Sequence, residues 1–468
     1  MLGMSTSLDV LTRDAHQLKA AGRLDEALSL YRQATERFPS SGVALHNHAG
    51  LLGDLGQYPE AVQMANRALK TGLDAPETWL VLARAELGRG AMDEAHHAYR
   101  QVLQRHPNSL PAQLEAAQLV WMTTGDRIQA LHGVEAALGK RGADPMLCMV
   151  KAQALEYMGD ASSALAALRG HASESGCPVP VLAYAAHLSA ETGDPAAALR
   201  FAERGRRAAP TESGALEALA RARLSAGDAR GAEEILEPLL QRLPGNQHVL
   251  AMLAVAWRLT GDPRYRTLYD YSRFVQVRPL SVPEGWANLQ SYVAELASEL
   301  KAAHPFQTHP FGHSVRHGSQ LPHVLRRTSP AIAAFPQALS GPLGSYLVQI
   351  QQGKGPLPMR NTGRVAIAGS WSVWLRPGGH HVDHVHQEGW ISSACYIELP
   401  SAVAAGGREG WLRFGRPGLA LAEELPAEHW IQPAPGLVAL FPSYMWHGTE
   451  LFSGQEPRLT MAFDLVPA

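Results

Sequence analysis

The chain has 468 residues, which at roughly 100–200 residues per domain corresponds to a few domains, or to a repeat array joined to one domain. Charged residues make up 18% and the formal net charge is −2, so the basic surplus typical of nucleic-acid-binding proteins is missing. The sequence contains no apolar run long enough for a membrane span and no signal-peptide pattern, so we expect neither. Three cysteines and 21 histidines favour a cytoplasmic protein in which any metal site uses imidazole and carboxylate ligands.

A regular period runs through the first 265 residues. Glycines recur at steps of 34 or 35 residues, and an alanine stands five residues after each of the first seven. A glycine turn between two helices and small residues at the helix contact explain both positions, so the period predicts helical hairpins that stack on their neighbours. The repeated glycines are Gly22, Gly56, Gly90, Gly125, Gly159, Gly193, Gly227 and Gly261.

This pattern resembles the tetratricopeptide repeat over residues 8–265. The resemblance implies an all-α superhelix whose concave groove holds a peptide or a protein, and the alternative is a purely structural or dimerising array. After Gly261 the pattern gives way to a tyrosine-containing segment, which predicts a capping helix. We therefore expect a repeat domain over residues 1–265, a capping helix and linker over 266–300, and a different domain over 301–468.

The C-terminal third has the pattern of a mainly-β domain. Short β-branched and aromatic stretches, such as VAIAGSWSVWLRP, WISSACYIELP and RLTMAFDLVP, are separated by turns rich in glycine and proline. Several short strands bounded by turn signals predict an antiparallel sandwich or jelly roll.

Two segments of this domain contain candidate metal ligands. The first contains His380, His381, Asp383, His384 and His386, and the second is a predicted strand and turn that end at His447. Side chains at positions i and i+2 of an extended segment point to the same side. One such pair, with His447 from a distant strand, would form the three-ligand face of a non-haem Fe(II) site. Both His381-x-Asp383 and His384-x-His386 satisfy this spacing.

An oxo-acid co-substrate also needs a cation for its far carboxylate. Arg458 and Thr460 stand two residues apart on the last predicted strand. A guanidinium offers two parallel donors to a carboxylate, and a hydroxyl on the same strand face adds a third. We therefore expect these two residues to bind 2-oxoglutarate.

The segments HVDHVHQEGWISSACYIELP, GLVALFPSYMWHGT and PRLTMAFD resemble a bacterial family of 2-oxoglutarate/Fe(II) oxygenases that are often joined to tetratricopeptide repeats. The resemblance covers roughly residues 300–468. It implies a double-stranded β-helix (a cupin-like jelly roll), Fe(II) as cofactor, 2-oxoglutarate as co-substrate, and hydroxylation or a related oxidation. It favours His384, His386 and His447 as the metal ligands, with His381 and Asp383 as the alternative first-strand pair.

Three further residues have two interpretations each. Tyr396 either packs in the core or reaches the oxo-acid, and Trp390 and Trp446 are either core residues or part of a substrate pocket. We expect a dioxygenase that hydroxylates a protein or peptide held by the repeat groove and releases succinate and CO2, with no catalytic residue beyond the metal centre. The alternatives are a non-catalytic repeat scaffold with a degenerate metal-binding jelly roll, and a metal-binding cupin, for example with zinc, that uses no oxo-acid.

Overall fold

The computed structural model describes residues 7–142, 144–351 and 355–468. The chain divides into two compact units, Met1–Val120 with Ile128–Lys151, and Trp121–Arg127 with Ala152–Ala468. Residues 1–6, which contribute to the expected absence of a signal peptide, lie outside the described residues. Among the described residues, no helix combines the length and the apolar character that a membrane crossing requires.

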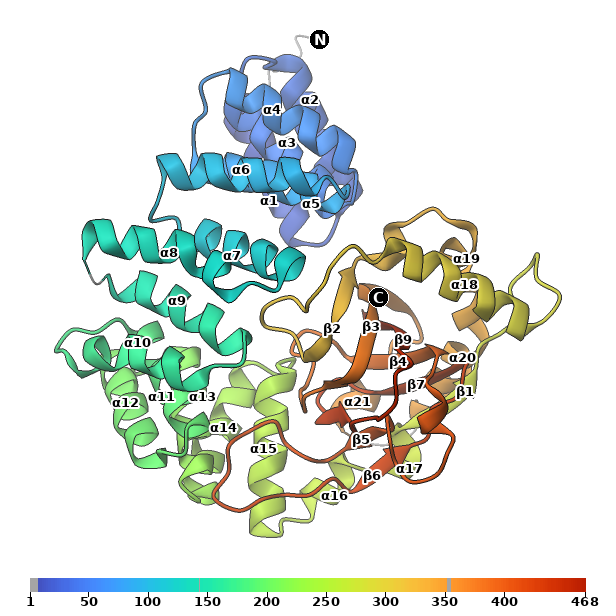
Figure 1. The fold of residues 1–468 in the computed structure, drawn as a ribbon. Helices are drawn as coiled ribbons and strands as arrows, with labels where there is room; N and C mark the ends of the chain where they lie inside the picture. The colour runs from blue at the N-terminus through green and yellow to red at the C-terminus, as the bar shows by residue number, and fades with distance from the viewer. Residues whose placement is uncertain (1–6, 143, 352–354) are drawn as a thin grey trace, which may run out of the picture. The chain divides into compact units, whose positions relative to one another are not determined.

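The N-terminal part of the chain consists of helix hairpins of the predicted period (Figure 1). Gly22 and Gly56 adopt positive φ values of 75° and 76° just after the first helix of their hairpins, a conformation that favours glycine. Ala27 and Ala61 are fully buried in the helix contacts. The helices are α1 (Leu8–Ala20), α2 (Leu24–Arg37), α3 (Gly42–Asp54), α4 (Tyr58–Lys70), α5 (Pro76–Gly88), α6 (Met92–Arg105), α7 (Leu110–Thr124) and α8 (Arg127–Arg141).

The hairpins continue up to the predicted end of the repeats, and a boundary between the two units falls within α9. The helices are α9 (Pro145–Tyr157), α10 (Ala161–Ser173), α11 (Val179–Glu191), α12 (Pro195–Ala208), α13 (Ser213–Ser225), α14 (Ala229–Arg242) and α15 (Gln247–Thr260). Two short helices, α16 (Arg264–Leu268) and α17 (Tyr271–Phe274), follow where a capping helix was expected.

The C-terminal part of the chain is built around antiparallel strands. Its strands are β1 (Gln276–Pro279), β2 (Val315–Pro322), β3 (Val365–His381), β4 (Ile391–Glu398), β5 (Leu412–Phe414), β6 (His429–Ile431), β7 (Leu437–Pro442), β8 (His447–Thr449) and β9 (Arg458–Pro467). They form a six-stranded sheet in the order β1-β7-β4-β9-β3-β2 and a three-stranded sheet in the order β6-β5-β8. The predicted fold class, helical repeats followed by a two-sheet β domain, is confirmed.

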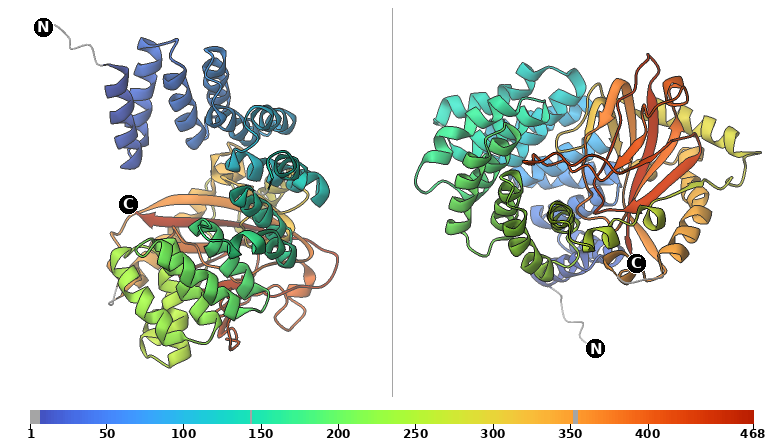
Figure 2. Two further views of the ribbon diagram at one scale, coloured as in Figure 1. Left: turned by 90° about the vertical axis from the view of Figure 1, so that its left-hand side faces the viewer. Right: turned by 90° about the horizontal axis from the view of Figure 1, so that it is seen from below.

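Helices cover one face of the large sheet (Figure 2). They are α18 (Leu289–Ala303), α19 (Pro330–Ala333) and α20 (Phe335–Ile350), and the short helices α21 (Pro356–Met359), η1 (Val324–Arg326) and η2 (Ser401–Val403) lie in the connections. The Phe335 ring meets the Phe463 ring of β9 edge to face at 6.1 Å between centroids. This packing leaves the opposite face of the sheet for the polar residues described below.

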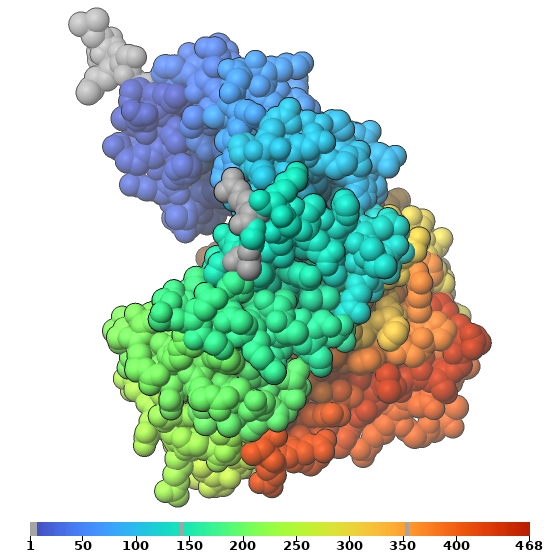
Figure 3. Space-filling model, turned by 60° about the vertical axis from the view of Figure 1, so that its left-hand side comes forward, coloured from blue at the N-terminus to red at the C-terminus, as the bar shows by residue number. Residues whose placement is uncertain are grey.

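The last repeats and the sheet domain share one hydrophobic core. The indole Nε1 of Trp446 donates to the carbonyl of Ala251 on α15 at 3.3 Å, and the Tyr269 hydroxyl donates to the carbonyl of Tyr444 at 3.1 Å. In the space-filling view the surface of the last repeat helices adjoins that of the sheet domain directly (Figure 3). The expected domain limits at residues 265 and 300 therefore stay predictions, and β1 lies in the segment that was expected to be a linker.

Candidate metal centre

Three of the predicted histidines converge on one small volume. His384 and His386 follow the end of β3 and His447 begins β8, yet one potential ligand atom from each lies within 4.8 Å of the others. The backbones of His384 and His447 are joined by two reciprocal N–H···O=C bonds of 2.9 and 3.0 Å. This bridge brings residues more than sixty positions apart in the sequence to opposite sides of one site.

The three imidazoles have the same orientation relative to the backbone. In each ring Nδ1 faces an oxygen that can only accept a hydrogen bond, so each Nδ1 must carry the proton. In a neutral ring Nε2 then keeps its lone pair, as a metal ligand requires. The Nδ1 acceptors are the Val382 carbonyl for His384 at 2.9 Å, the Met445 carbonyl for His447 at 2.9 Å, and the Asp464 carboxylate for His386 at 2.6 Å.

The Nε2 atoms of His384 and His386 are only 3.1 Å apart. At this distance a proton on one ring can be shared with the other as a hydrogen bond, and a bound metal ion would take the place of that proton. Burial, followed by the neighbouring histidines, lowers the pKa of His384 well below its usual value, and burial has the same effect on the pKa of His447. Neutral imidazoles with converging lone pairs fit a divalent transition metal.

Asp464 on β9 completes the support of His386 and was not predicted from the sequence. Its carboxylate accepts hydrogen bonds from Nδ1 of His386 and, at 2.7 Å, from the hydroxyl of Ser392. A carboxylate behind a ligating imidazole holds the ring and raises its basicity. One signal in the sequence could have identified Asp464: it is a single acidic residue in an apolar strand, at even spacing from Arg458 and Thr460. A buried charge requires a partner, so such a residue is a candidate for a site.

The alternative first-strand pair is engaged with other protein groups. Nδ1 of His381 lies 2.9 Å from the hydroxyl of Ser314, and the His381 ring lies 6.0 Å from the His384 ring. The Asp383 carboxylate accepts two hydrogen bonds of 2.8 Å from Nε and Nη2 of Arg413. The structure thus brings His384 and His386 to His447, whereas metal ligation by either pair stays a prediction.

Arg458 is a buried cation without an anionic partner among the described residues. It is 2% exposed, its Nη1 donates to the carbonyl of Gly410 at 2.6 Å, and its buried Nε has no hydrogen-bond acceptor there. Burial lowers the pKa of Arg458. Leaving a buried charge unpaired is costly, so this guanidinium fits a carboxylate ligand.

The residues around Arg458 support the same interpretation. Its Cζ lies 5.6 Å from the ring centroid of Tyr396, whose buried hydroxyl also has no partner in the described part of the chain. Thr460, opposite Tyr396 in the β4–β9 register, is 6% exposed. The pKa of His381 falls to about 3, mainly by burial and secondly by the Arg458 charge.

Trp390 and Trp446 are core residues. They are 1% and 4% exposed, and the indole of Trp390 donates to the carbonyl of Leu357 at 3.1 Å. Neither lines the cavity described next, so a role in a substrate pocket stays a prediction.

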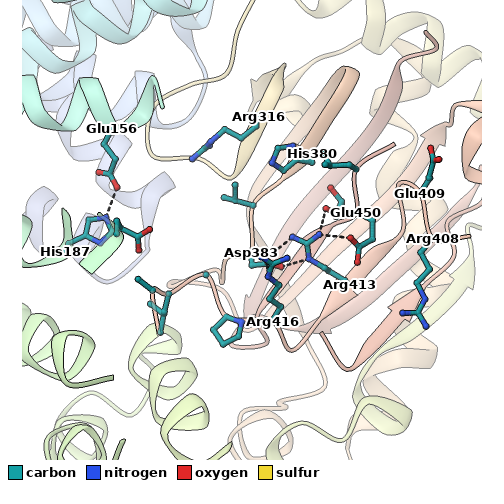
Figure 4. Close-up of a pocket in the computed structure, with 18 residues that line it drawn as sticks. Glu156, His187, Arg316, His380, Asp383, Arg408, Glu409, Arg413, Arg416 and Glu450 are labelled. Atoms are coloured by element: carbon teal, nitrogen blue, oxygen red, sulfur yellow. Dashed lines mark hydrogen bonds and ion pairs between the residues drawn. The ribbon is translucent and has the colours of Figure 1, made fainter. Parts of the chain in front are cut away.

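A cavity of about 920 Å³ lies beside the histidine cluster, within the second unit (Figure 4). Helices α9 and α11 contribute Glu156, His187 and Glu191 to one side of it. The other side comes from the sheet domain and includes Asp383, which precedes His384, and Thr449, which follows His447 by two residues.

Two protein families match this chain. Residues 369–464 match the family described as "Putative 2OG-Fe(II) oxygenase", and residues 46–109 match the family described as "Tetratricopeptide repeat". The first of these matches contains every residue of the histidine cluster together with Arg458, Thr460 and Asp464.

Similar solved structures cover the chain in part. A structure of Naa15/Naa10 bound to HypK-THB is 21% identical, covers 57% of this chain and has a TM-score of 0.27; the chain spans only 42% of its length. A tetratricopeptide repeat protein from Parabacteroides merdae ATCC 43184 is 15% identical, covers 53% of this chain and 98% of its own, and has a TM-score of 0.36. The first TPR of Spaghetti (RPAP3), bound to an HSP90 peptide, is 22% identical and has a TM-score of 0.24. The match covers 25% of this chain and 92% of the chain in that structure. The chain thus joins tetratricopeptide repeats to a C-terminal domain that resembles the 2OG-Fe(II) oxygenase family.

Proposed function

We propose that this chain is an Fe(II)- and 2-oxoglutarate-dependent dioxygenase. The observation that carries the proposal is the convergence of one potential ligand atom from each of His384, His386 and His447, all within 4.8 Å of one another. The oxygenase family match over residues 369–464 supports the same class of reaction.

In this proposal each polar group near the cluster has one task. The three imidazoles hold Fe(II) on one face and leave the remaining positions open. Arg458, with the hydroxyls of Tyr396 and Thr460, receives the far carboxylate of 2-oxoglutarate and so orients its other end. Once bound, the metal and the oxo-acid supply the oxidising chemistry, with succinate and CO2 as co-products. The chain itself contributes binding, orientation and the exclusion of water.

Asp464 gives this site a charge that three imidazoles lack. A set of three neutral ligands leaves the full charge of a divalent metal uncompensated, unlike a set that includes a carboxylate. The Asp464 carboxylate lies one hydrogen bond away, on Nδ1 of His386, and its side chain is 14% exposed. We infer that Asp464 compensates part of the metal charge through His386.

We further propose that the substrate is a protein or peptide held by the repeats and that the oxidation is a hydroxylation. The tetratricopeptide match and the shared core between the last repeats and the sheet domain support a substrate that contacts both. A cytoplasmic location stays a prediction.

Uncoupled turnover tests the reaction class without a known substrate. Purified full-length protein is supplied with Fe(II), 2-oxoglutarate and O2, and succinate is measured with and without each component. We expect succinate that depends on all three components and disappears in His447→Ala. No succinate above the level of the heat-denatured protein, together with no Fe(II) binding, would favour a non-catalytic repeat scaffold.

A further inference from the structure

The 920 Å³ cavity beside the histidine cluster has two chemically different walls. The repeat wall carries the carboxylates Glu156 and Glu191, and the sheet wall carries four arginines among its lining residues. In Figure 4, Glu156 and His187 project from the repeat helices, while Arg316 and His380 project from the strands opposite them. The sheet wall also carries the carboxylates Asp383, Glu409 and Glu450, so it matters which of these charges already have partners.

Several of these charges are already compensated within the protein. Arg413 pairs with Asp383 and donates from Nη1 to Glu450 at 3.1 Å. Glu156 lies 2.6 Å from Nε2 of His187 and also accepts from the Tyr184 hydroxyl. These groups have their hydrogen bonds without a ligand.

Arg316 and His380 are different, because both keep unused hydrogen-bonding capacity. They stand opposite each other in the β2–β3 register and both line the cavity, so their side chains share one face. Only Nη1 of Arg316 is bonded, to the carbonyls of His313 and Val315 at 2.8 and 2.9 Å, and no carboxylate of the described residues is within ion-pair distance. The buried Nδ1 of His380 likewise has no partner in the described part of the chain.

These two side chains have the chemistry of a carboxylate site. A half-buried guanidinium with free Nε and Nη2 presents two donors in one plane, which is the geometry of bidentate carboxylate binding. Burial lowers the pKa of Arg316, with Glu156 acting in the opposite sense, so its charge has little compensation at close range. The His380 ring, which lines the same wall, is the second polar group beside this guanidinium.

The location of the cavity, between repeat helices and the sheet domain, favours a polypeptide as its occupant. Its volume is near the upper end of the roughly 300–1,000 Å³ of small-molecule pockets. Repeat helices form one wall, and the other includes Asp383, which precedes His384, and Thr449, two residues after His447. A chain segment that lies here passes beside the proposed metal site.

We propose that this cavity receives a segment of a polypeptide substrate, and that Arg316 and His380 hold a carboxylate of that segment. The inference rests on the proposed function, because it identifies where the substrate of that reaction binds. The carboxylate belongs either to an aspartate or glutamate side chain or to the C-terminus of the substrate.

Labelled peptide pools test the proposal. Three degenerate heptapeptide pools are compared. The first has a central aspartate and an amidated C-terminus, and the second, neutral at both places, has a central asparagine and an amidated C-terminus. The third has a central asparagine and a free C-terminus. Binding to the full chain, loaded anaerobically with Fe(II) and 2-oxoglutarate, is measured by fluorescence anisotropy. We expect at least about tenfold tighter binding of one carboxylate-bearing pool than of the neutral pool. The pool that binds identifies the source of the carboxylate.

Matched variants assign the effect to the two residues. Arg316→Gln should abolish the preference for the carboxylate pool, and Arg316→Lys should restore part of it. Arg408→Gln makes the same charge change in the same cavity, but the Arg408 guanidinium already lies 3.6 Å above the Trp430 ring, so the preference should persist. Equal binding of all pools, or an undiminished preference in Arg316→Gln, would overturn the proposal.

Two further observations separate this inference from the proposed function. The absorption band that appears when Fe(II) and 2-oxoglutarate bind should be unchanged in Arg316→Gln, because Arg316 is outside the metal and co-substrate sites. Absence of that band in the wild type would count against the proposed function instead. Binding of free glutarate in the cavity, with no binding of any peptide pool, would show that the site takes a small acid and would contradict the inference.

Discussion

Nδ1 of His386 donates to the carboxylate of Asp464 across 2.6 Å, and this bond joins the loop after β3 to the last strand, β9. The bond leaves Nε2 of His386 facing Nε2 of His384, 3.1 Å away. The identity of residue 464 therefore decides both the tautomer and the position of a proposed ligand.

Asp464→Asn should weaken Fe(II) binding while preserving the fold. An amide is neutral and cannot compensate the metal charge through His386, so we expect a loss of about 10- to 100-fold in affinity. The measurement is an anaerobic competition with a chelator of known Fe(II) affinity. Glu450→Gln is the control, because that carboxylate bonds Arg413 and Trp430 rather than a histidine, and its Fe(II) affinity should match the wild type. Unchanged affinity in Asp464→Asn would remove this role.

Arg458→Met should separate co-substrate binding from stability. Since Arg458 is 2% exposed and has no counter-ion among the described residues, an apolar side chain of similar length should not lower the stability of the unliganded protein. The affinity for 2-oxoglutarate should fall by about 2–5 kcal/mol, because its carboxylate loses a charged partner. Calorimetry and urea unfolding give the two quantities. A destabilised variant with normal 2-oxoglutarate affinity would indicate a purely structural arginine.

Arg413→Ala should destabilise the sheet domain. The Arg413 and Asp383 side chains are 10% and 7% exposed and share two hydrogen bonds, so removal of Arg413 leaves the buried carboxylate only its longer ion pair with Arg416, at 3.6 Å. The expected loss is about 3–5 kcal/mol in the free energy of unfolding. The double variant Arg413→Met with Asp383→Leu should lose less than Arg413→Ala alone. Equal losses in both would show that the ion pair is not the cause.

His48 in α3 should make the folded state acid-sensitive. Burial lowers its pKa to about 4 in the folded chain, and its Nδ1 lies 3.2 Å from the Thr35 hydroxyl. The unfolded chain has a pKa of about 6.5, so between these values only the unfolded state binds the proton and stability falls as the pH falls. Urea unfolding at pH 7 and pH 4.5 should show about 2 kcal/mol less loss in His48→Gln than in the wild type. An equal loss in both proteins would contradict the assignment.

The sequence predicted the periodic features of the fold and missed those that depend on register. Gly22 and its equivalents mark turns because positive φ is a local requirement of the backbone, so the repeats were visible from spacing alone. β1 was missed, since its four residues, QVRP, are too few to show an alternation. Asp464 was missed for a different reason, because its partner His386 is 78 residues away and only the folded sheet joins them.

The choice between the two candidate ligand pairs also depends on contacts that form only in the folded chain. His381-x-Asp383 and His384-x-His386 have the same spacing, so alternation cannot separate them. The difference comes from Arg413 on β5, which holds Asp383, and from the bridge between His384 and His447.

Anaerobic titration of the full chain with Fe(II) and 2-oxoglutarate, followed by visible absorption, tests the assignment of His384, His386 and His447 most directly. The account predicts a charge-transfer band in the wild type that persists in His381→Ala and Asp383→Asn and is lost in His386→Ala and His447→Ala. Circular dichroism of each variant confirms that it is folded. A band that survives in His386→Ala but disappears in folded Asp383→Asn, or no band in the wild type, would contradict the account.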